Sequence, residues 1–341
     1  MLRGNNFARQ SSRIGRAGLA ACLVVAVIFL NVASGRAEQV RIAYSAISGA
    51  MGPLWMAHDL GYFKRQGLDV QLLYIGGGSV VMQALLGGDV QFVRLGANAV
   101  VQATSRGAGL KMIGNTINRL VFSLMSRPQI QSAAELKGGK IGVTRLGGST
   151  DFALDLALKQ WGFRRGTDVA VVQTGGMPQL LGAIQAQSVD AGVISPPTNL
   201  QAEKLGLKEL VDFGDLEILY PNSPLAATEK YLRRNRDVAL RLLRAYCEGI
   251  HRVKTDRETT LKIFAKYTKV KDHDILAELY RIYGIKHLER IPYVKPEAVD
   301  EVLRTEVKTG GAKSADFIDN TFLTELEREG FFRQLYRQEV Q

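Results

Sequence analysis

The chain has 341 residues, a formal net charge of +11 and two cysteines. This length exceeds one ordinary hydrophobic core and suits two lobes. The Lys and Arg residues form no dense run interleaved with aromatic residues, which argues against nucleic acid as a partner.

The first 37 residues have the pattern of a secretory signal peptide. Arginines without any acid precede an almost unbroken apolar run, and the small residues of Gly35-Arg36-Ala37 follow it. We predict cleavage before Glu38 and a periplasmic protein, or a membrane-tethered one if the run remains as an anchor. Cys22 lies at the start of the apolar run, so lipidation there is not expected. Cleavage would leave Cys247 alone, in a helical apolar pattern, without a disulfide partner.

A segment of about sixty residues occurs twice, at a constant offset of ninety-nine positions. The copy from Val40 to Asn98 aligns without a gap on the copy from Gly139 to Pro197. Identities include Ile42 with Ile141, Arg65 with Arg164 and Gly76-Gly77 with Gly175-Gly176. The alternative is chance similarity between α/β units, which the constant offset makes the poorer explanation. Two similar α/β halves predict two lobes with a ligand cleft between them.

Each copy is predicted to form strand, helix, strand, helix and strand, in that order. Strands alternating with helices imply parallel pairing with right-handed crossovers. In the first copy the strands are expected over 40–45, 70–75 and 91–95, and the helices over 54–62, 79–86 and from 98 onward. Further strands near 110–117 and 121–125 complete the first part of the chain.

Proline-marked segments predict that the chain crosses between the lobes twice, near 126–128 and near 220–224. After the first crossing, Ser132 and Glu135 match a capping box. The rest of the chain is predicted to be helical over 236–254, 258–267, 275–283, 296–308 and 321–329. We therefore expect a two-strand hinge, with one lobe formed by 38–126 and 223–341 and the other by 127–222.

The predicted carboxyl ends of the strands are rich in Gly, Ser and Thr. Ligands of doubly wound sheets bind at these ends, where helix N–H groups favour a negative charge. Taken singly, each loop is better explained by tight turns and helix caps. The matching loops 45–51 and 144–150, facing each other across a cleft, favour ligand contact.

Three arginines are candidates for binding an anion. Arg94 interrupts an apolar strand, and buried arginine is rare unless paired. It either faces the cleft and holds a carboxylate or sulfonate bidentately, or pairs with an acid at the sheet edge. Arg145, in the second cleft loop, is a somewhat better candidate, and Arg119 is a weaker one.

The sequence offers little for catalysis, metal binding or cofactor binding. Val81 occupies the third glycine position of a dinucleotide fingerprint that begins at Gly76, and no Walker lysine follows a glycine loop. The four histidines lack metal-ligand spacing, and no G-x-S-x-G elbow occurs. We expect no catalytic residue, no metal and no cofactor.

The stretch from Pro53 to Val70 resembles the signature of the nitrate/sulfonate/bicarbonate-type substrate-binding proteins of ABC importers. That family includes alkanesulfonate, taurine and thiamine-precursor binders. Residues 136–143 and 322–331 are similar to its other recurring stretches, so the likeness covers nearly all of the chain after residue 37. The resemblance implies an α/β fold of the type II periplasmic binding protein class. It also implies a chain, expected to be monomeric, that captures a small anionic solute and delivers it to a membrane permease.

The resemblance further implies ligand contacts from the first-strand loop, from the Gly-Gly-Ser helix start and from the corresponding loops of the second lobe. With the residue-based candidates Ser45 and Arg145 included, the expected ligand-binding set is Ser45, Ser48, Gly49, Gly78, Ser79, Asn98, Arg145, Gly148, Ser149, Thr150 and Ser195.

Two other function classes compete with transport. Pyrimidine synthases that resemble this family carry a cysteine cluster, and the single Cys247 argues against that enzyme. Chorismate-dehydratase-like relatives are normally cytoplasmic, which the signal peptide contradicts. A ligand sensor or adaptor that binds a partner protein is the other class, and the sequence alone does not separate it from an importer component.

Overall fold

The computed structural model describes residues 37–306 and 311–337. The predicted signal peptide up to Arg36, including Cys22, lies outside the described residues. The chain divides into a unit over Met1–Glu38 and a unit over Gln39–Gln341, and the second holds the architecture given below. Within the part of the chain that the structure describes, every helix is too short or too polar to cross a membrane.

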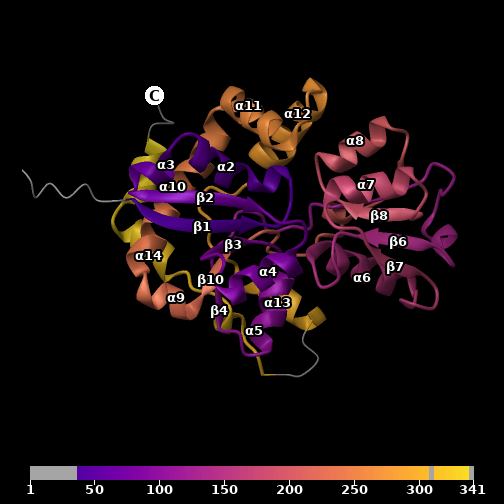
Figure 1. Cartoon of the computed structure of the whole chain (residues 1–341), viewed down its shortest axis with the longest axis horizontal. Helices are drawn as coiled ribbons and strands as arrows, with labels where there is room; N and C mark the ends of the chain where they lie inside the picture. The colour runs from indigo at the N-terminus through magenta and orange to yellow at the C-terminus, as the bar shows by residue number, and fades with distance from the viewer. Residues whose placement is uncertain (1–36, 307–310, 338–341) are drawn as a thin grey trace, which may run out of the picture. The chain divides into compact units, whose positions relative to one another are not determined.

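Two mixed five-stranded sheets form the centre of the second unit, in the left and right halves of Figure 1. The first sheet has the strand order β2-β1-β3-β10-β4, and the second has the order β7-β6-β8-β5-β9. The first comprises β1 (Glu38–Tyr44), β2 (Leu68–Tyr74), β3 (Phe92–Arg94), β4 (Leu110–Gly114) and β10 (Leu225–Thr228). The second comprises β5 (Ser123–Ser126), β6 (Lys140–Val143), β7 (Ala170–Gln173), β8 (Ala191–Ile194) and β9 (Lys208–Asp212).

The two sheets have the same order once the ninety-nine-residue offset is applied, because β2, β1, β3 and β4 correspond to β7, β6, β8 and β9. The fourth position of the order is filled differently in the two sheets. β10 and β5 fill it, each antiparallel to both of its neighbours. The second sheet is formed by one continuous stretch of chain, from β5 to β9, whereas the first sheet takes β10 from beyond the second crossing.

The pairing of β5 corrects one expectation from the sequence. The segment 121–125 was predicted to complete the first lobe, but β5 pairs with β8 and β9 of the second sheet. The chain therefore leaves the first sheet before Ser123, earlier than the predicted crossing at 126–128. All four residues of β5 are buried. An apolar strand of this kind fits any covered sheet, so only its hydrogen-bond partners decide which sheet it joins.

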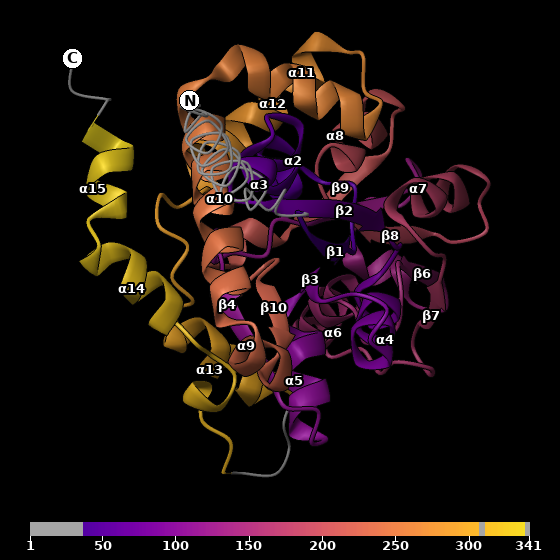
Figure 2. The same ribbon diagram turned by 60° about the vertical axis from the view of Figure 1, so that its left-hand side comes forward.

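Helices cover both faces of the first sheet. Along β1, Val40 and Ile42 face one hydrophobic cluster and Ala43 faces the other, as the two-residue period of a strand requires. The first cluster includes side chains of α2 (Gly52–Asp59) and α10 (Arg236–Thr255), and the second includes side chains of α4 (Gly78–Gly87), α5 (Ala97–Ser105) and α13 (Pro296–Glu306). Figure 2 shows α14 (Thr321–Arg328) and α15 (Phe331–Tyr336) beside α10, which both of them contact.

The second sheet is covered by α6 (Ser149–Trp161), α7 (Met177–Gln185) and α8 (Thr198–Lys204). The remaining helices are α3 (Tyr62–Arg65), α9 (Glu229–Arg234), α11 (Arg257–Thr268) and α12 (His273–Tyr280). The predicted helix over 275–283 changes character after Tyr280, where a π-helix continues over Arg281–His287. Cys247 is buried with a free thiol, as the sequence predicts.

The capping box predicted at Ser132 does not form. Residues Ala133–Leu136 make only a short 3-10 turn, and the Ser132 side chain makes no cap hydrogen bond. The Ser132 hydroxyl instead donates to Oε1 of Glu135 at 2.8 Å. The short 3-10 turn does not bring a backbone N–H to the Ser132 hydroxyl, so the hydroxyl is left with the carboxylate as its partner.

Candidate functional site

A small cavity lies between the loops that follow the carboxyl ends of the strands in the two sheets. Its volume is about 20 Å³, which is room for about one water molecule. None of the residues that line it carries a charged side chain. The lining residues are Ser45, Ala46, Ser48, Gly77, Gly78, Phe122, Thr144, Ser149, Met177, Ser195, Asn222 and Ser223.

Helices α4 and α6, one from each sheet, both begin at this cavity. α4 starts at Gly78, α6 starts at Ser149, and neither start has a side-chain cap hydrogen bond. Free N–H groups and the helix dipole at such starts favour a negative charge. Asp151 in the first turn of α6 is paired with Arg165 at 2.5 Å, so its own charge is compensated.

One hydroxyl of the cavity has no partner within the described residues. Ser195 is 2 % exposed, and its Oγ makes no hydrogen bond there. By contrast, the Ser48 hydroxyl is hydrogen bonded to the Tyr283 hydroxyl at 2.9 Å. Leaving a buried hydroxyl unsatisfied costs about 1–3 kcal/mol, which a ligand acceptor would remove.

The loops of the two sheets touch each other beside the cavity. Asn98 at the start of α5 donates through Nδ2 to the carbonyl oxygen of Gly147 at 3.0 Å. The Tyr220 hydroxyl donates to Oδ1 of the same Asn98 at 2.7 Å, and burial raises the pKa of that hydroxyl. From the second sheet, Nε of Arg145 lies 3.5 Å from the carbonyl oxygen of Gly76.

Several loop glycines are needed because of these contacts. The stem of Arg145 occupies the space that a Cβ on Gly77 would need. The Tyr74 hydroxyl does the same at Gly176, and the Tyr220 hydroxyl does so at Gly96. Turns, caps and ligand contact were the functions predicted for these glycines. The structure adds a further function for these glycines: they let the loops of the first sheet and the loops of the second sheet approach each other closely.

The three candidate arginines have different surroundings. Arg145 is half-buried against Gly77 and does not line the cavity. Arg119 lies on the first crossing, and its buried Nη1 has no partner among the described residues. Arg94 is 0 % exposed, and its Nε and Nη2 donate to the carbonyl oxygen of Ser223 at 2.9 and 2.7 Å.

The structure contradicts the interpretation of Arg94 as the partner of an acid, and it places the guanidinium behind the cavity wall. Its Nη1 donates to the Tyr246 hydroxyl, so all of its recorded partners are neutral. It contacts no acid at the sheet edge within the described residues, and it is not a lining residue of the cavity. Burial lowers the pKa of Arg94, but a guanidinium remains charged in proteins.

The predicted ligand-binding residues divide into three groups. Those that line the cavity are Ser45, Ser48, Gly78, Ser149 and Ser195. Those beside it in loop-to-loop or loop-internal contacts are Asn98, Arg145, Gly148 and Thr150, the last hydrogen bonded to the Thr144 hydroxyl at 2.9 Å. Those farther from it are Gly49, packed against the Tyr283 ring, and Ser79, which lines a separate groove of about 470 Å³ between α4 and α5.

The sequence analysis missed four lining residues from other parts of the chain. Phe122, Asn222 and Ser223 lie on the two crossings, and Met177 opens α7. The polar residues around Pro221 and Pro224 were a usable signal, but they were interpreted only as a hinge. Phe122 and Met177 gave no such signal, because apolar residues occur both in cavity walls and in hydrophobic cores.

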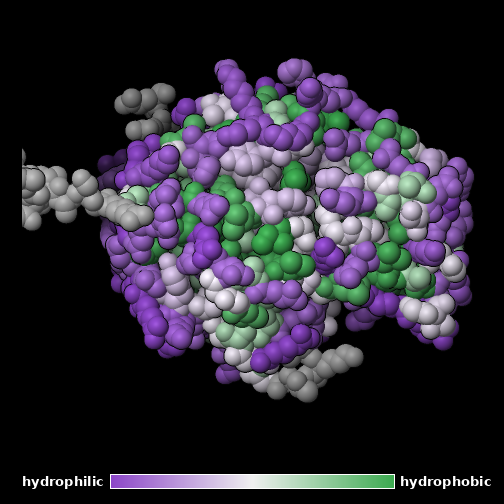
Figure 3. Space-filling view, viewed as in Figure 1, coloured by the Kyte–Doolittle hydropathy of each residue, from purple (hydrophilic) through white to green (hydrophobic). Residues whose placement is uncertain are grey.

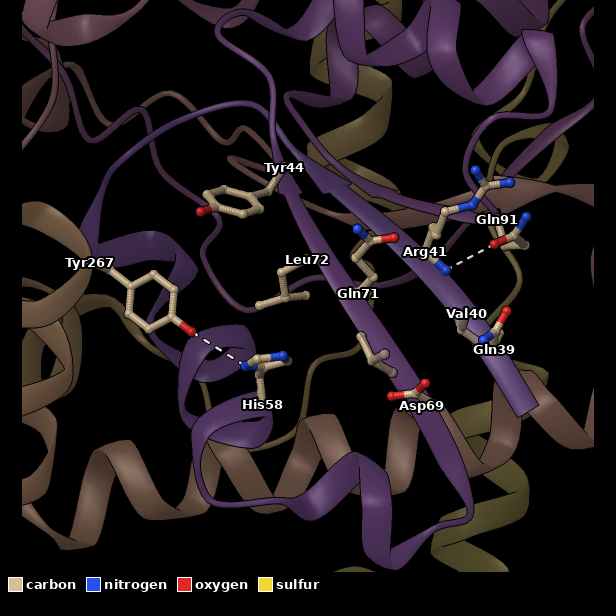
Figure 4. A pocket seen from close by; sticks show the side chains of 11 residues that line it. Gln39, Val40, Arg41, Tyr44, His58, Asp69, Gln71, Leu72, Gln91 and Tyr267 are labelled. Atoms are coloured by element: carbon tan, nitrogen blue, oxygen red, sulfur yellow. Dashed lines mark hydrogen bonds between the residues drawn. The ribbon is translucent and has the colours of Figure 1, made fainter. Parts of the chain in front are cut away.

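Two larger surface features lie outside this cavity. A hollow of about 790 Å³ follows β1 and β2, where Figure 4 shows Arg41, Gln71 and Gln91 on one side and His58 and Tyr267 on the other. It contains no predicted ligand-binding residue and no start of α4 or α6, so its size alone does not make it the site. On the face in Figure 3, hydrophobic residues gather near the middle, over α4.

Comparisons with known proteins agree with this architecture. The family model described as NMT1/THI5 like matches residues 49–259. A Brucella abortus protein named as a binding protein is 27% identical over 261 residues, which is 74% of this chain and 79% of that protein.

Two solved structures show the same fold. The periplasmic aliphatic sulphonate binding protein SsuA from Escherichia coli is 22% identical with a TM-score of 0.63, over 79% of this chain and 90% of that one. The periplasmic nitrate-binding protein NrtA from Synechocystis PCC 6803 is 14% identical with a TM-score of 0.72, over 86% of this chain and 89% of that one.

The fold is therefore α/β of the type II periplasmic binding protein class, as the sequence analysis predicts. The predicted family is confirmed as well, because the matched residues make up more than half of the chain. The chain belongs to the NMT1/THI5-like family.

Proposed function

We propose that this protein is the substrate-binding component of an ABC importer and captures a small anionic solute in the cavity between the two sheets. One observation carries the proposal. Two helix starts without side-chain caps, one from each sheet, meet at a cavity whose buried Ser195 hydroxyl has no hydrogen-bond partner among the residues that the structure describes. Relatives named as binding proteins, and solved structures named for sulphonate and nitrate binding, support it.

Capture would require the two sheets to separate and close again. The cavity is too small for a sulfonate in the present arrangement. We propose that the sheets with their helices act as two lobes, hinged at the crossings. A ligand that touches the loops of both sheets binds tightly only when the two lobes are closed. Binding therefore shifts the population of the protein toward the closed arrangement.

The cavity lining suggests how such a ligand would be oriented. Its anionic group would lie toward the starts of α4 and α6 and the hydroxyl of Ser195, which supply N–H and O–H donors. An apolar part would pack on Phe122 and Met177. An organic sulfonate or carboxylate fits this division better than a fully polar ion.

Reversible binding fits the cavity better than turnover does. Its lining residues include no His, Cys, Lys, Asp or Glu, so no general base or strong nucleophile faces a ligand. An enzyme on the same fold is therefore the weaker alternative.

The signal pattern at the N-terminus and the periplasmic relatives support a periplasmic location for the protein.

Native mass spectrometry of the protein purified from its host tests this proposal directly. We expect a retained small anion that is released chemically unchanged. In parallel, calorimetry should cover a panel of nitrate, sulfate, methanesulfonate and benzenesulfonate, with the neutral sulfonamides as matched controls. Binding of at least one anion, without conversion, is the expected result. Conversion of the ligand would point to an enzyme, and the absence of any anion binding would contradict the proposal.

A further inference from the structure

Arg94 is a buried cation that the described structure leaves without a counter-charge. It lies on β3 between β1 and β10, paired with Tyr44 on one side and Leu225 on the other. Its guanidinium bonds only to the Ser223 carbonyl oxygen and the Tyr246 hydroxyl, and it forms no ion pair within residues 37–306 and 311–337. Taking an ion out of water without a partner is costly, so such an arrangement needs a compensating role.

The same residue contacts two walls of the ligand cavity. Its guanidinium holds the carbonyl oxygen of Ser223 through two hydrogen bonds, and Ser223 lines the cavity. Its backbone oxygen accepts from the amide of Ser45 at 3.0 Å, and Ser45 lines the cavity as well. The positive charge therefore lies one residue behind the cavity surface, in contact with the second crossing, and the backbone of the same residue holds the first-strand loop.

We propose that Arg94 determines the charge selectivity of the cavity without touching the ligand. This inference rests on the proposed function and adds a positioning residue to it. The field of a buried charge is weakly screened, so it reaches through one layer of wall and stabilises an anion on the other side. A neutral ligand of the same shape gains nothing from this field. The two bonds to Ser223 also fix the crossing segment against the first sheet.

Arg145 is a poorer candidate for this selectivity. It is half-buried, and its side chain packs on Gly77 outside the cavity. Solvent screens a partly exposed charge strongly, and its contribution falls further as salt is added. Arg94 is 0 % exposed, so its effect on a ligand should persist at high ionic strength.

The test compares one anion with its neutral counterpart in the full-length protein. The probes are methanesulfonate with methanesulfonamide and benzenesulfonate with benzenesulfonamide, and the measured quantity is the ratio of the two affinities. Arg94→Met should lower that ratio by about tenfold or more, because it removes the charge and keeps an unbranched apolar stem in the buried site. Tyr246→Phe is the control. It removes one hydrogen-bond partner but no charge, so the ratio should stay at the wild-type value.

Arg94→Lys covers the case in which Arg94→Met does not fold. Lysine keeps the charge but cannot make both hydrogen bonds to Ser223, so it should weaken both probes and preserve their ratio. A purely structural role would lower the affinities of anion and neutral probe alike in Arg94→Met. That result overturns the inference, as does a folded Arg94→Lys variant that loses its preference for the anion. If the wild-type protein binds neither sulfonate more tightly than its sulfonamide, the charge-selectivity inference fails, whereas the proposed function fails only if no anion of the panel binds.

Discussion

At the scale of single residues, the cavity combines groups that are costly for stability and useful for binding. Among the described residues, the Ser195 hydroxyl at the cavity has no hydrogen-bond partner, and the Arg94 guanidinium behind the cavity wall has no carboxylate partner. Natural proteins accept such costs mainly at functional sites. The two residues come from different sheets, so a ligand between them would relieve both costs at once.

Replacing Ser195 separates binding from stability. Ser195→Ala should weaken the binding of the anion identified from the panel by about ten- to a hundredfold, because a hydrogen bond to a charged ligand is worth roughly 1.5–3 kcal/mol. The ligand-free variant should be as stable as the wild type or more so, since an unsatisfied hydroxyl is removed. Calorimetry and thermal unfolding measure the two effects.

The exposed Ser132→Ala variant serves as the matched control and should leave affinity unchanged. Lower stability of Ser195→Ala with unaltered affinity would mean that the hydroxyl is structural, and Ser195 would then have to be removed from the proposed site.

At the scale of elements, the glycine-rich loops permit the two sheets to approach each other. Gly176 caps the start of α7, and its Cα lies where only a hydrogen atom fits beside the Tyr74 hydroxyl. Gly77 caps α4 and faces the stem of Arg145 in the same way. The conformation of these loops therefore depends on the contacts between them as well as on any ligand.

Adding a methyl group at Gly176 should oppose closure. Gly176→Ala should reduce ligand affinity by about tenfold or more, because a clash of this kind typically costs 1–3 kcal/mol. Combining it with Tyr74→Phe removes the hydroxyl that the methyl meets. The methyl also meets Oε1 of Gln179, but that atom is the end of a flexible side chain on the same helix and can move aside, so affinity should recover in the double variant. Titration calorimetry on both variants measures the change.

Gly182→Ala is the matched control on the same helix, α7, because nothing lies within 4 Å of an added Cβ there. It should leave affinity unchanged and favour the helix slightly. If Gly176→Ala bound the ligand as tightly as the wild type, the contact with Tyr74 would have no part in closure.

At the scale of the whole molecule, the chain passes between its sheets twice and returns to contribute β10 to the first sheet. The crossing segments run beside each other, with the amide of Asn222 donating to the carbonyl oxygen of Ile117 at 2.9 Å. Asn222 also donates through Nδ2 to the carbonyl oxygen of Arg119 at 2.9 Å. Hinges of this kind absorb a change in dihedral angles within few residues while the two sheets stay intact.

Binding should change the separation of the sheets. We expect small-angle scattering to give a smaller radius of gyration when the anion identified from the panel saturates the protein, because a ligand bridging both loop sets favours closure. The neutral sulfonamides, which should bind more weakly, serve as controls at the same concentration and should change the radius less. Equal radii with and without a tightly bound anion would show that capture does not require lobe motion.

The sequence by itself determined much of the architecture. The ninety-nine-residue offset predicts the correspondence of β1, β2 and β3 with β6, β7 and β8. It can do so because hydrophobic alternation and glycine turns are determined by short stretches of sequence. For the same reason the glycine-rich segments before Gly78 and Ser149 could be predicted, and the structure places both helix starts at the cavity. Five of the expected ligand-binding residues do line the cavity.

Only the tertiary structure decided which groups are partnered. β5 joins the second sheet through its hydrogen-bond partners, which no local pattern encodes. Arg94 meets Ser223, 129 positions away, and the Ser195 hydroxyl is unsatisfied only because nothing folds against it within the described residues. Such pairings depend on distances between segments far apart in the chain. A sequence read locally can therefore name the residue types of a site but not their neighbours.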